Sequence, residues 1–386
     1  MFLHLPVDIN RNEYKPDRNY HVRKTKNLVE RYPMPGHRTP KNFYSAFAAS
    51  GIAMTLMLSP HIARAGEEVN IYSYRQAELI APLLENFTRQ TGIRTNVLFL
   101  KKGLVDRVKA EGANSPADVI LTVDIGRLNS AKTSSVTQPV ESAAIAANIP
   151  SEYRDPSGHW FGVTTRARVI FASKDRVPQN KITYEELADP KWKGKICTRS
   201  GQHSYNIGLF ASMIAHHGEE YTEKWLRGVR ANLARKPQGN DRAQAKAIFA
   251  GECDIGIGNT YYVGKMQTNE KKPEQKEWAA SMKVLFPNVG DRGSHVNISG
   301  MAMTKNAPNA ENARKLMEFL SSGTAQEIYA EVVFEYPVKP GTKTSELVRG
   351  FGELKSDKLS LQTIAENRKA ASKLVDKVGY NDGPTS

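Results

Sequence analysis

The chain has 386 residues, 40% apolar and 24% charged, a composition typical of a globular protein long enough for two substantial cores. The formal net charge of +14 raises nucleic acid or a membrane surface as partner. Its distribution weakens that reading, because residues 1–66 carry ten Lys/Arg against four Asp/Glu and leave about +8 for the rest. The chain also lacks a basic, aromatic-rich motif, so we expect no nucleic-acid partner.

The amino-terminal segment is predicted to be an export signal. Its apolar run, Phe43–Leu58, follows basic residues and precedes an Ala-Arg-Ala triplet that ends at Ala65, a pattern typical of secretory cleavage. The run is short and interrupted for a membrane span, which leaves an anchor as the alternative. We therefore expect residues 1–65 to be a leader and signal peptide, with translation starting at Met34 and no membrane insertion after cleavage.

The chain contains two cysteines, Cys197 and Cys253. In an exported chain, two cysteines favour one disulfide bond. The alternative is a pair of buried thiols on neighbouring strands.

Residues 69–123 alternate between short apolar strands and amphipathic helices. The helix at 78–92 has apolar residues at helical spacing and a terminal glycine. The expected order is strand 69–72, helix 78–92, strand 93–101, helix 103–115 and strand 117–123. This β-α-β-α-β order predicts a parallel sheet with helices on its faces, and ligands of such sheets bind where the strands end.

A second α/β unit follows a long alternating strand at 160–172. Its expected strands are 195–199 and 254–258, and strand 295–304 returns to the first unit. The tail at 343–379 is polar and mostly helical. Two α/β lobes joined by two crossing strands imply a ligand cleft between them. The predicted boundaries are 66–164 plus 297–338 for the first lobe and 165–296 plus 339–386 for the second.

Tyrosines gather in the loops that follow these strands: Tyr74, Tyr205, Tyr261 and Tyr262. A phenol has a pKa of about 10, so only a highly charged, hard cation readily displaces its proton at neutral pH. Softer or divalent metals favour histidine, cysteine or carboxylate ligands. The residues therefore suggest an Fe(III) site, whose three charges three phenolates would neutralise.

A small anion is expected beside the metal. Ser200, Gly201 and Gln202 lead into a helix, whose free N–H groups suit an anion. Arg75 and Arg166 would add charge and bidentate hydrogen bonds. Carbonate fits such a seat because it is small, planar and abundant.

Packing is the alternative role for the adjacent tyrosines, because successive residues of a strand point to opposite faces. Both can face a cleft only where the strand has ended, which Gly258 and Gly264 permit. His203 is more typical of a hydrogen-bonded loop residue than of a ligand. Asp124 is a candidate either for a helix cap or for a cleft acid.

The chain resembles the ferric-iron-binding periplasmic proteins of bacterial ABC importers over residues 67–380. The resemblance rests on VNIYSYRQAELIAPLLENFTRQTGI, SPADVILTVDIGRL, HWFGVTTRARVIFASKD, YEELADPKWKGKICTRSGQHSYN, GECDIGIGNTYY and HVNISGMAMTKNAPN, in that order. It implies a two-lobed periplasmic binding protein fold of type II, in which two crossing strands act as hinges.

The resemblance also implies a ligand set. Tyr261 and Tyr262 correspond to the consecutive iron-binding tyrosines of the family, and Tyr205 to a tyrosine that one large branch adds. Some branches supply His from the first loop and some supply His-Tyr, but here residues 72–76 contain no histidine, and Val123 and Asp124 stand where the His branch takes a Glu. The tyrosine-rich, carbonate-dependent type is therefore implied, with Arg75 on the anion. Tyr74 is a further candidate ligand.

The expected function is thus a monomeric periplasmic Fe(III) receptor that delivers iron to a membrane permease and its ATPase, without catalysis. One alternative is a receptor of the same fold for a polyamine, thiamine or another oxyanion. A polyamine site would need several carboxylates, and Asp124 is the main candidate found. The other alternative is a transferase on this fold, which the position of both cysteines within strands disfavours.

Overall fold

The computed structural model describes residues 68–384, and a nine-stranded mixed sheet runs through them. The strand order is β2-β1-β3-β8-β4-β6-β5, and β7 and β9 pair with β4. The predicted leader and signal peptide lie outside the described residues. None of the helices within 68–384 is long and apolar enough to cross a membrane.

The first lobe contains the predicted β-α-β-α-β segment. Strand β1 (Glu68–Ser73) pairs in parallel with β2 (Arg94–Phe99) and β3 (Val119–Thr122). Helix α1 (Ala77–Thr91) ends at Gly92, whose φ of 74° suits a residue without a side chain. The other helices of this lobe are α2 (Leu104–Glu111), α3 (Ile125–Thr133), α4 (Ala143–Asn148), α9 (Ala310–Ser321) and α10 (Gly323–Val333).

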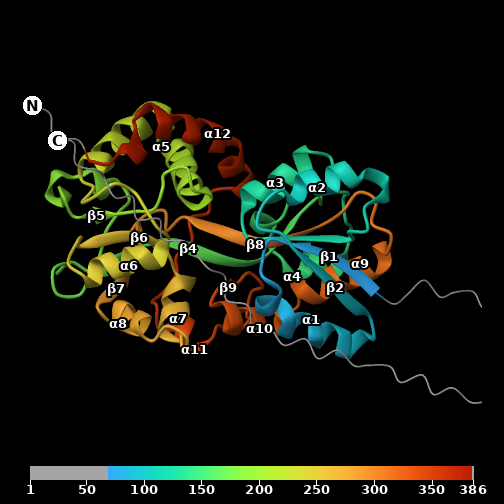
Figure 1. Ribbon diagram of the computed structural model, residues 1–386. Coiled ribbons are helices and arrows are strands. Elements are labelled where there is room, and N and C mark those ends of the chain that lie inside the picture. The colour runs from blue at the N-terminus through green and yellow to red at the C-terminus, as the bar shows by residue number, and fades with distance from the viewer. Residues whose placement is uncertain (1–67, 385–386) are drawn as a thin grey trace, which may run out of the picture. The chain divides into compact units, whose positions relative to one another are not determined.

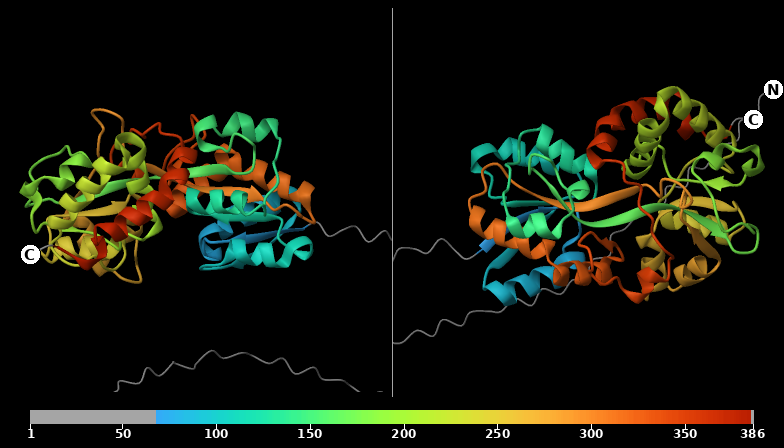
Figure 2. Two further views of the ribbon diagram at one scale, coloured as in Figure 1. Left: turned by 90° about the horizontal axis from the view of Figure 1, so that it is seen from above. Right: turned by 180° about the vertical axis from the view of Figure 1, so that it is seen from behind.

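Strand β4 (Phe161–Ser173) belongs to both parts of the sheet. Its first half pairs with β8 (Val296–Met303) and its second half pairs with β6 and β7, all antiparallel. All 13 residues of β4 are buried, as expected for a strand covered on both faces. The short β9 (Tyr336–Pro337) pairs with the middle of β4. Figure 2 shows β4 and β8 side by side between the helices of the two lobes.

The second lobe surrounds the other half of the sheet. Its strands are β5 (Ile196–Cys197), β6 (Ile255–Asn259) and β7 (Met282–Leu285), and β5 pairs with β6 in parallel. Its helices are α5 (Ser204–Ala231), α6 (Asp241–Phe249), α7 (Tyr261–Gln267), α8 (Glu274–Ala280), α11 (Glu346–Arg349) and α12 (Leu361–Lys377). Helix α5 is interrupted at Gly218 (φ 83°, ψ 168°) and packs along α12 (Figure 1). Short 3₁₀ helices cover Gly112–Asn114, Ser151–Tyr153, Glu185–Ala188, Pro190–Trp192 and Tyr380–Asp382.

Two elements differ from the sequence prediction for local reasons. The strand expected at 195–199 is only two residues long, because the side-chain amide of Asn206 binds the carbonyls of Arg199 and Ser200. Tyr261 and Tyr262 are the first residues of α7 rather than part of a loop. The exact lobe boundaries stay a prediction.

The cysteines form the expected disulfide bond. Cys197 ends β5, whereas Cys253 precedes β6 instead of lying within a strand as expected, and their Cα atoms are 5.9 Å apart. Both residues are buried against apolar neighbours of the second lobe. The bond therefore joins the two chain segments that lead to Tyr205 and Tyr261.

Candidate metal centre

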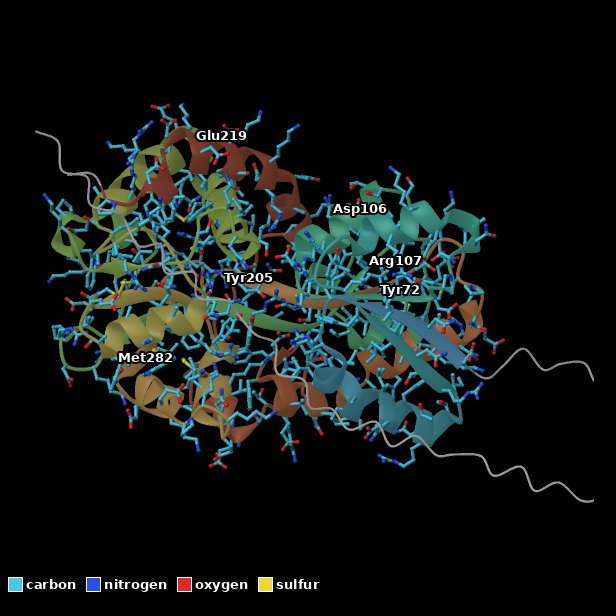
Figure 3. The ribbon with its side chains drawn as sticks, in the orientation of Figure 1. Tyr72, Asp106, Arg107, Tyr205, Glu219 and Met282 are labelled. Carbon is cyan, nitrogen blue, oxygen red and sulfur yellow. A yellow bond between two sulfur atoms is a disulfide. The ribbon has the colours of Figure 1, made fainter. Side chains whose placement is uncertain are left out.

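Tyr205 lies in the first turn of α5. Figure 3 shows it in the middle of the view, and its ring lies near Arg166 and Arg168 of β4. His203 is the N-cap residue of α5, and its Nδ1 accepts a hydrogen bond from the backbone N–H of Tyr205 at 3.2 Å. Burial and the neighbouring Arg199 lower the pKa of His203 to about 4. His203 is therefore neutral at physiological pH and acts as a helix cap, in agreement with its predicted role as a hydrogen-bonded residue.

The start of α7 places the other two tyrosines beside Tyr205. Strand β6 ends at Asn259, whose N–H donates to a carboxylate oxygen of Asp241 at 2.9 Å. The helix that begins two residues later turns Tyr261 and Tyr262 to the same side, with ring centroids 4.3 Å apart. The hydroxyl oxygens of Tyr205 and Tyr261 are 3.2 Å apart. Three phenols from two different helices thus converge.

These phenols line a cleft of about 360 Å³ between the lobes. Residues of the first lobe form one wall, including Tyr74, Arg75 and Val123, and α5, α6 and α7 form the other. The charged residues that line it are Arg75, Lys101, Arg127, Arg166, Arg242, Lys265 and Glu335. Glu335 is the one carboxylate among these lining residues, so the wall is strongly cationic. This charge suits an anionic ligand, or a metal bound together with anions.

Burial keeps Tyr261 and Tyr262 protonated when no metal is bound. The pKa of Tyr261 lies well above its usual value of 10, because of burial first and then the nearby Tyr205 and Tyr262. Burial and Tyr205 also raise the pKa of Tyr262. A cation must therefore displace protons to bind here, which selects for high charge. Within residues 68–384 there is no group of three or more His, Cys, Asp or Glu that could hold a metal ion.

Three arginines surround the ring of Tyr205. The guanidinium carbons of Arg166, Arg168 and Arg199 lie 5.7, 6.0 and 5.3 Å from its centroid. Arg168 and Arg199 share the buried carboxylate of Asp241, at 2.7 and 2.9 Å. The two arginines outweigh burial and lower the pKa of Asp241, so the carboxylate is ionised. One carboxylate thus balances two cations, and the excess positive charge favours an anion beside Tyr205.

Arg166 has hydrogen-bonding capacity left over. Its side chain is 1% exposed and one terminal nitrogen donates to the carbonyl of Val123. Its Nε and Nη1 have no partner within residues 68–384. Buried donors without a partner are costly, so an arginine that lines a cleft with two such donors is a candidate for binding an anion.

Arg75 is held from behind by Glu335. One of its terminal nitrogens donates to Ser299 Oγ at 2.7 Å and to Glu335 Oε1 at 2.8 Å. Burial by itself would raise the pKa of Glu335. Arg75, Arg166 and two hydroxyl donors outweigh burial and lower this pKa to about 2. Glu335 is therefore ionised at all physiological pH values. The pair orients Arg75 at the cleft wall and neutralises its charge.

We expect Glu335→Gln to make folding stability less sensitive to acid. The pKa of Glu335 is lowered from 4.5 to about 2, so the stability it contributes is present above the unfolded value and lost as pH falls through the folded value. Urea unfolding at several pH values between about pH 5 and pH 2 measures the slope of the unfolding free energy against pH. Glu331→Gln, at an exposed position of α10, is the matched control and should retain the slope. An equal slope in wild type and Glu335→Gln would contradict the assignment.

Tyr74 lines the cleft but uses its hydroxyl elsewhere. Its phenol oxygen accepts a hydrogen bond from the N–H of Leu104 at 3.1 Å, at the start of α2. Its ring lies 4.0 Å from the guanidinium of Arg127. Tyr74 would have to exchange the Leu104 bond for a metal in order to act as a ligand.

Ser200, Gly201 and Gln202 are not brought to the cleft. The N–H of Gly201 donates to Asn381, and that of Gln202 donates to the Ser200 hydroxyl. The side chain of Gln202 binds α12 at Asp376. The donors predicted to form an anion seat are thus used within the fold, because the carboxy-terminal segment covers this turn.

Sequence reasoning missed several cleft residues. They are Lys101, Arg127, Arg242, Lys265 and Glu335. Lys265 lies 5.2 Å from the Tyr261 ring. The two residues are four positions apart, so a helix predicted to start at Tyr261 would have placed Lys265 on the same face. Glu335 and Arg127 carry no such local signal. Asp124 caps α3 by accepting from the N–H of Gly126 at 2.9 Å, which supports the capping role among its two predicted roles.

Comparison with known proteins identifies relatives of this chain. Residues 114–349 match the family model described as bacterial extracellular solute-binding protein. Iron uptake protein A1 of Synechocystis sp. is 46% identical over 316 residues, which cover 81% of this chain and 88% of that protein. A second relative from the same organism, iron uptake protein A2, is 39% identical and covers 89% of this chain and 99% of that protein.

Solved structures show the same fold. Ferric iron-binding protein A of Mannheimia haemolytica, in an open conformation, has a TM-score of 0.78 and 53% identity, covering 82% of this chain and 99% of that chain. The Trichodesmium protein IdiA, solved with iron and citrate, has a TM-score of 0.78 and 43% identity, covering 81% and 99%. The chain has the two-lobed, type II solute-binding fold, and it belongs to the family of bacterial extracellular solute-binding proteins that includes the iron uptake proteins.

Proposed function

We propose that this chain is a receptor that binds Fe(III) in the cleft through the phenolates of Tyr205, Tyr261 and Tyr262. The main observation in support is the convergence of these three rings, with two hydroxyl oxygens 3.2 Å apart, in a cleft lined by cations. The names of the relatives, which are iron uptake and ferric iron-binding proteins, point the same way.

Charge supports Fe(III) over other cations. Three phenolates together balance three positive charges, and Fe(III) compensates for the desolvation that keeps Tyr261 and Tyr262 protonated in its absence. Cationic organic ligands such as polyamines or thiamine are disfavoured, because Glu335 is the one carboxylate among the lining residues and is already paired with Arg75.

An anion would complete the site on the arginine side. Arg166 offers two buried donors that have no partner among residues 68–384, and Arg75 lines the same cleft. Carbonate is the anion we propose. The positive charge beyond these two arginines also suits a polycarboxylate, and the Trichodesmium relative was solved with iron and citrate. Ser200, Gly201 and Gln202 have no part in this proposal, and Tyr74 enters it only as a ligand that would first leave Leu104.

The proposed biological role follows from this binding activity. The mature chain would act as a periplasmic monomer without catalysing a reaction. Closure of the lobes about β4 and β8 would enclose the iron, as in other hinged receptors. Reopening at an ABC permease, driven by its ATPase, would release it.

Adding Fe(III) with bicarbonate to the purified apo-protein should produce an orange-red colour, because phenolate-to-iron charge transfer absorbs visible light. A visible spectrum taken during the titration measures the band and the stoichiometry. A parallel titration with citrate in bicarbonate-free buffer distinguishes the two anions. A colourless protein that retains no iron after desalting would rule out the ferric site.

A further inference from the structure

Helix α12 of the second lobe also contacts the first lobe. It packs along α5 and reaches α3, the helix that follows β3 (Figure 1). This contact is separate from the hinge strands. A side chain at this contact can therefore influence how the lobes are held without touching the ligand.

Arg368 of α12 makes polar contacts with both lobes. Its Nη2 lies 3.3 Å from Oδ1 of Asp124, the residue that caps α3. Its Nη1 donates to the carbonyl of Ser204 at 3.3 Å. Ser204 begins α5 and immediately precedes Tyr205. One guanidinium thus connects the first lobe to the backbone that carries a proposed iron ligand.

One helical glycine makes space for this guanidinium. A Cβ atom on Gly126 of α3 would lie closer to Arg368 Nε than Cβ atoms come to their neighbours, whereas one on Gly208 of α5 would lie 3.6 Å from Nη1, an ordinary contact distance. Neither glycine has a positive φ, so the backbone does not require glycine at these positions. Glycine within a helix carries a free-energy cost relative to alanine. At Gly126 the close approach of Arg368 gives a reason for that cost.

The other contacts of Asp124 lie within its own lobe or on β8. It accepts from Gly126 N–H at 2.9 Å and from the side-chain amide of Asn297 at 2.8 Å. These bonds would keep α3 capped if Arg368 were replaced. Replacing Arg368 would therefore remove the connection between the lobes, because Arg368 contacts both Asp124 and the carbonyl of Ser204.

We propose that Arg368 is an interlobe positioning residue that holds the Asp124 cap of the first lobe against the start of α5, and so sets the spacing of the lobes and slows the release of iron. The effect on iron rests on the proposed function. The effect on lobe spacing does not, and the two are measured separately.

Lobe spacing can be measured in the apo-protein. Spin labels at Asp106→Cys on α2 and Glu219→Cys on α5, both exposed (Figure 3), report the distance between lobes by pulsed electron resonance. In this labelled background, Arg368→Met should shift or broaden the distance distribution, and Asp124→Asn should do the same. Lys369→Met, at an exposed neighbouring position of α12, should leave it unchanged. An unchanged distribution in both Arg368→Met and Asp124→Asn would overturn the proposal.

Iron release provides the second measurement. Transfer of Fe(III) to an excess chelator should be about 10-fold faster in Arg368→Met than in Lys369→Met, within the usual range of coupling between sites. Asp124→Asn should accelerate iron release less in the Arg368→Met background than in wild type, because both substitutions act through one contact. Equal release rates in wild type and Arg368→Met would refute the effect on release. If wild type binds no iron, the proposed function fails, and the distance measurement still tests the connection between lobes.

Discussion

Tyr261→Phe should lower the affinity for Fe(III) by more than about 100-fold, the upper end of the loss seen when a group that merely supports a metal ligand is removed. The substitution keeps the buried ring and its stacking on Tyr262 and deletes only the oxygen that meets Tyr205. The remaining phenolates would leave one of the three metal charges unbalanced. Competition titration against a chelator of known affinity measures the change, and the charge-transfer band should weaken in parallel.

Tyr336→Phe is the matched control for this prediction. Tyr336 is partly buried, its hydroxyl has no partner within residues 68–384, and it does not line the cleft. Its loss should change neither affinity nor colour. Tyr205→Phe and Tyr262→Phe should each behave like Tyr261→Phe. A normal band and affinity in any one of the three would remove that tyrosine from the ligand set.

Removing the disulfide should cost about 4 kcal/mol of unfolding free energy. Cys197 and Cys253 are 56 residues apart, and closing a loop of that length restricts the unfolded chain by roughly this amount in the loop-entropy model. The double variant Cys197→Ala/Cys253→Ala suits the test because both side chains are buried in apolar surroundings. Denaturant unfolding with linear extrapolation measures the difference.

Reductant provides an internal control for the disulfide prediction. It should lower the stability of wild type to that of the double variant and leave the variant unchanged. The charge-transfer band of the folded variant should keep its position, because the sulfur atoms do not line the cleft. A loss below about 1 kcal/mol would show that the cross-link contributes little to the folded lobe.

The sequence alone was informative where structure is local. Alternating apolar residues predicted β1 and β4, helical spacing with a terminal Gly92 predicted α1, and the paired cysteines predicted the disulfide. Each of these features depends on neighbouring residues or on residue counts. The α/β class with a two-lobed arrangement followed from the order of the elements, because β-α-β connections restrict the sheet to few topologies.

The sequence also determined which residue types are available for the chemistry. Tyrosines follow the strands of both lobes, and phenolates select for a hard, highly charged cation. Tertiary structure decided which of them meet. It brought Tyr205 to within hydrogen-bonding distance of Tyr261, engaged Tyr74 with Leu104, and covered Ser200–Gln202 with the carboxy-terminal segment. It also assembled the cationic wall, the Arg75–Glu335 pair and the Arg368 contact. These residues are up to 260 positions apart, so no periodicity or motif predicts their contacts, and only the packing of helices on the shared sheet places them together.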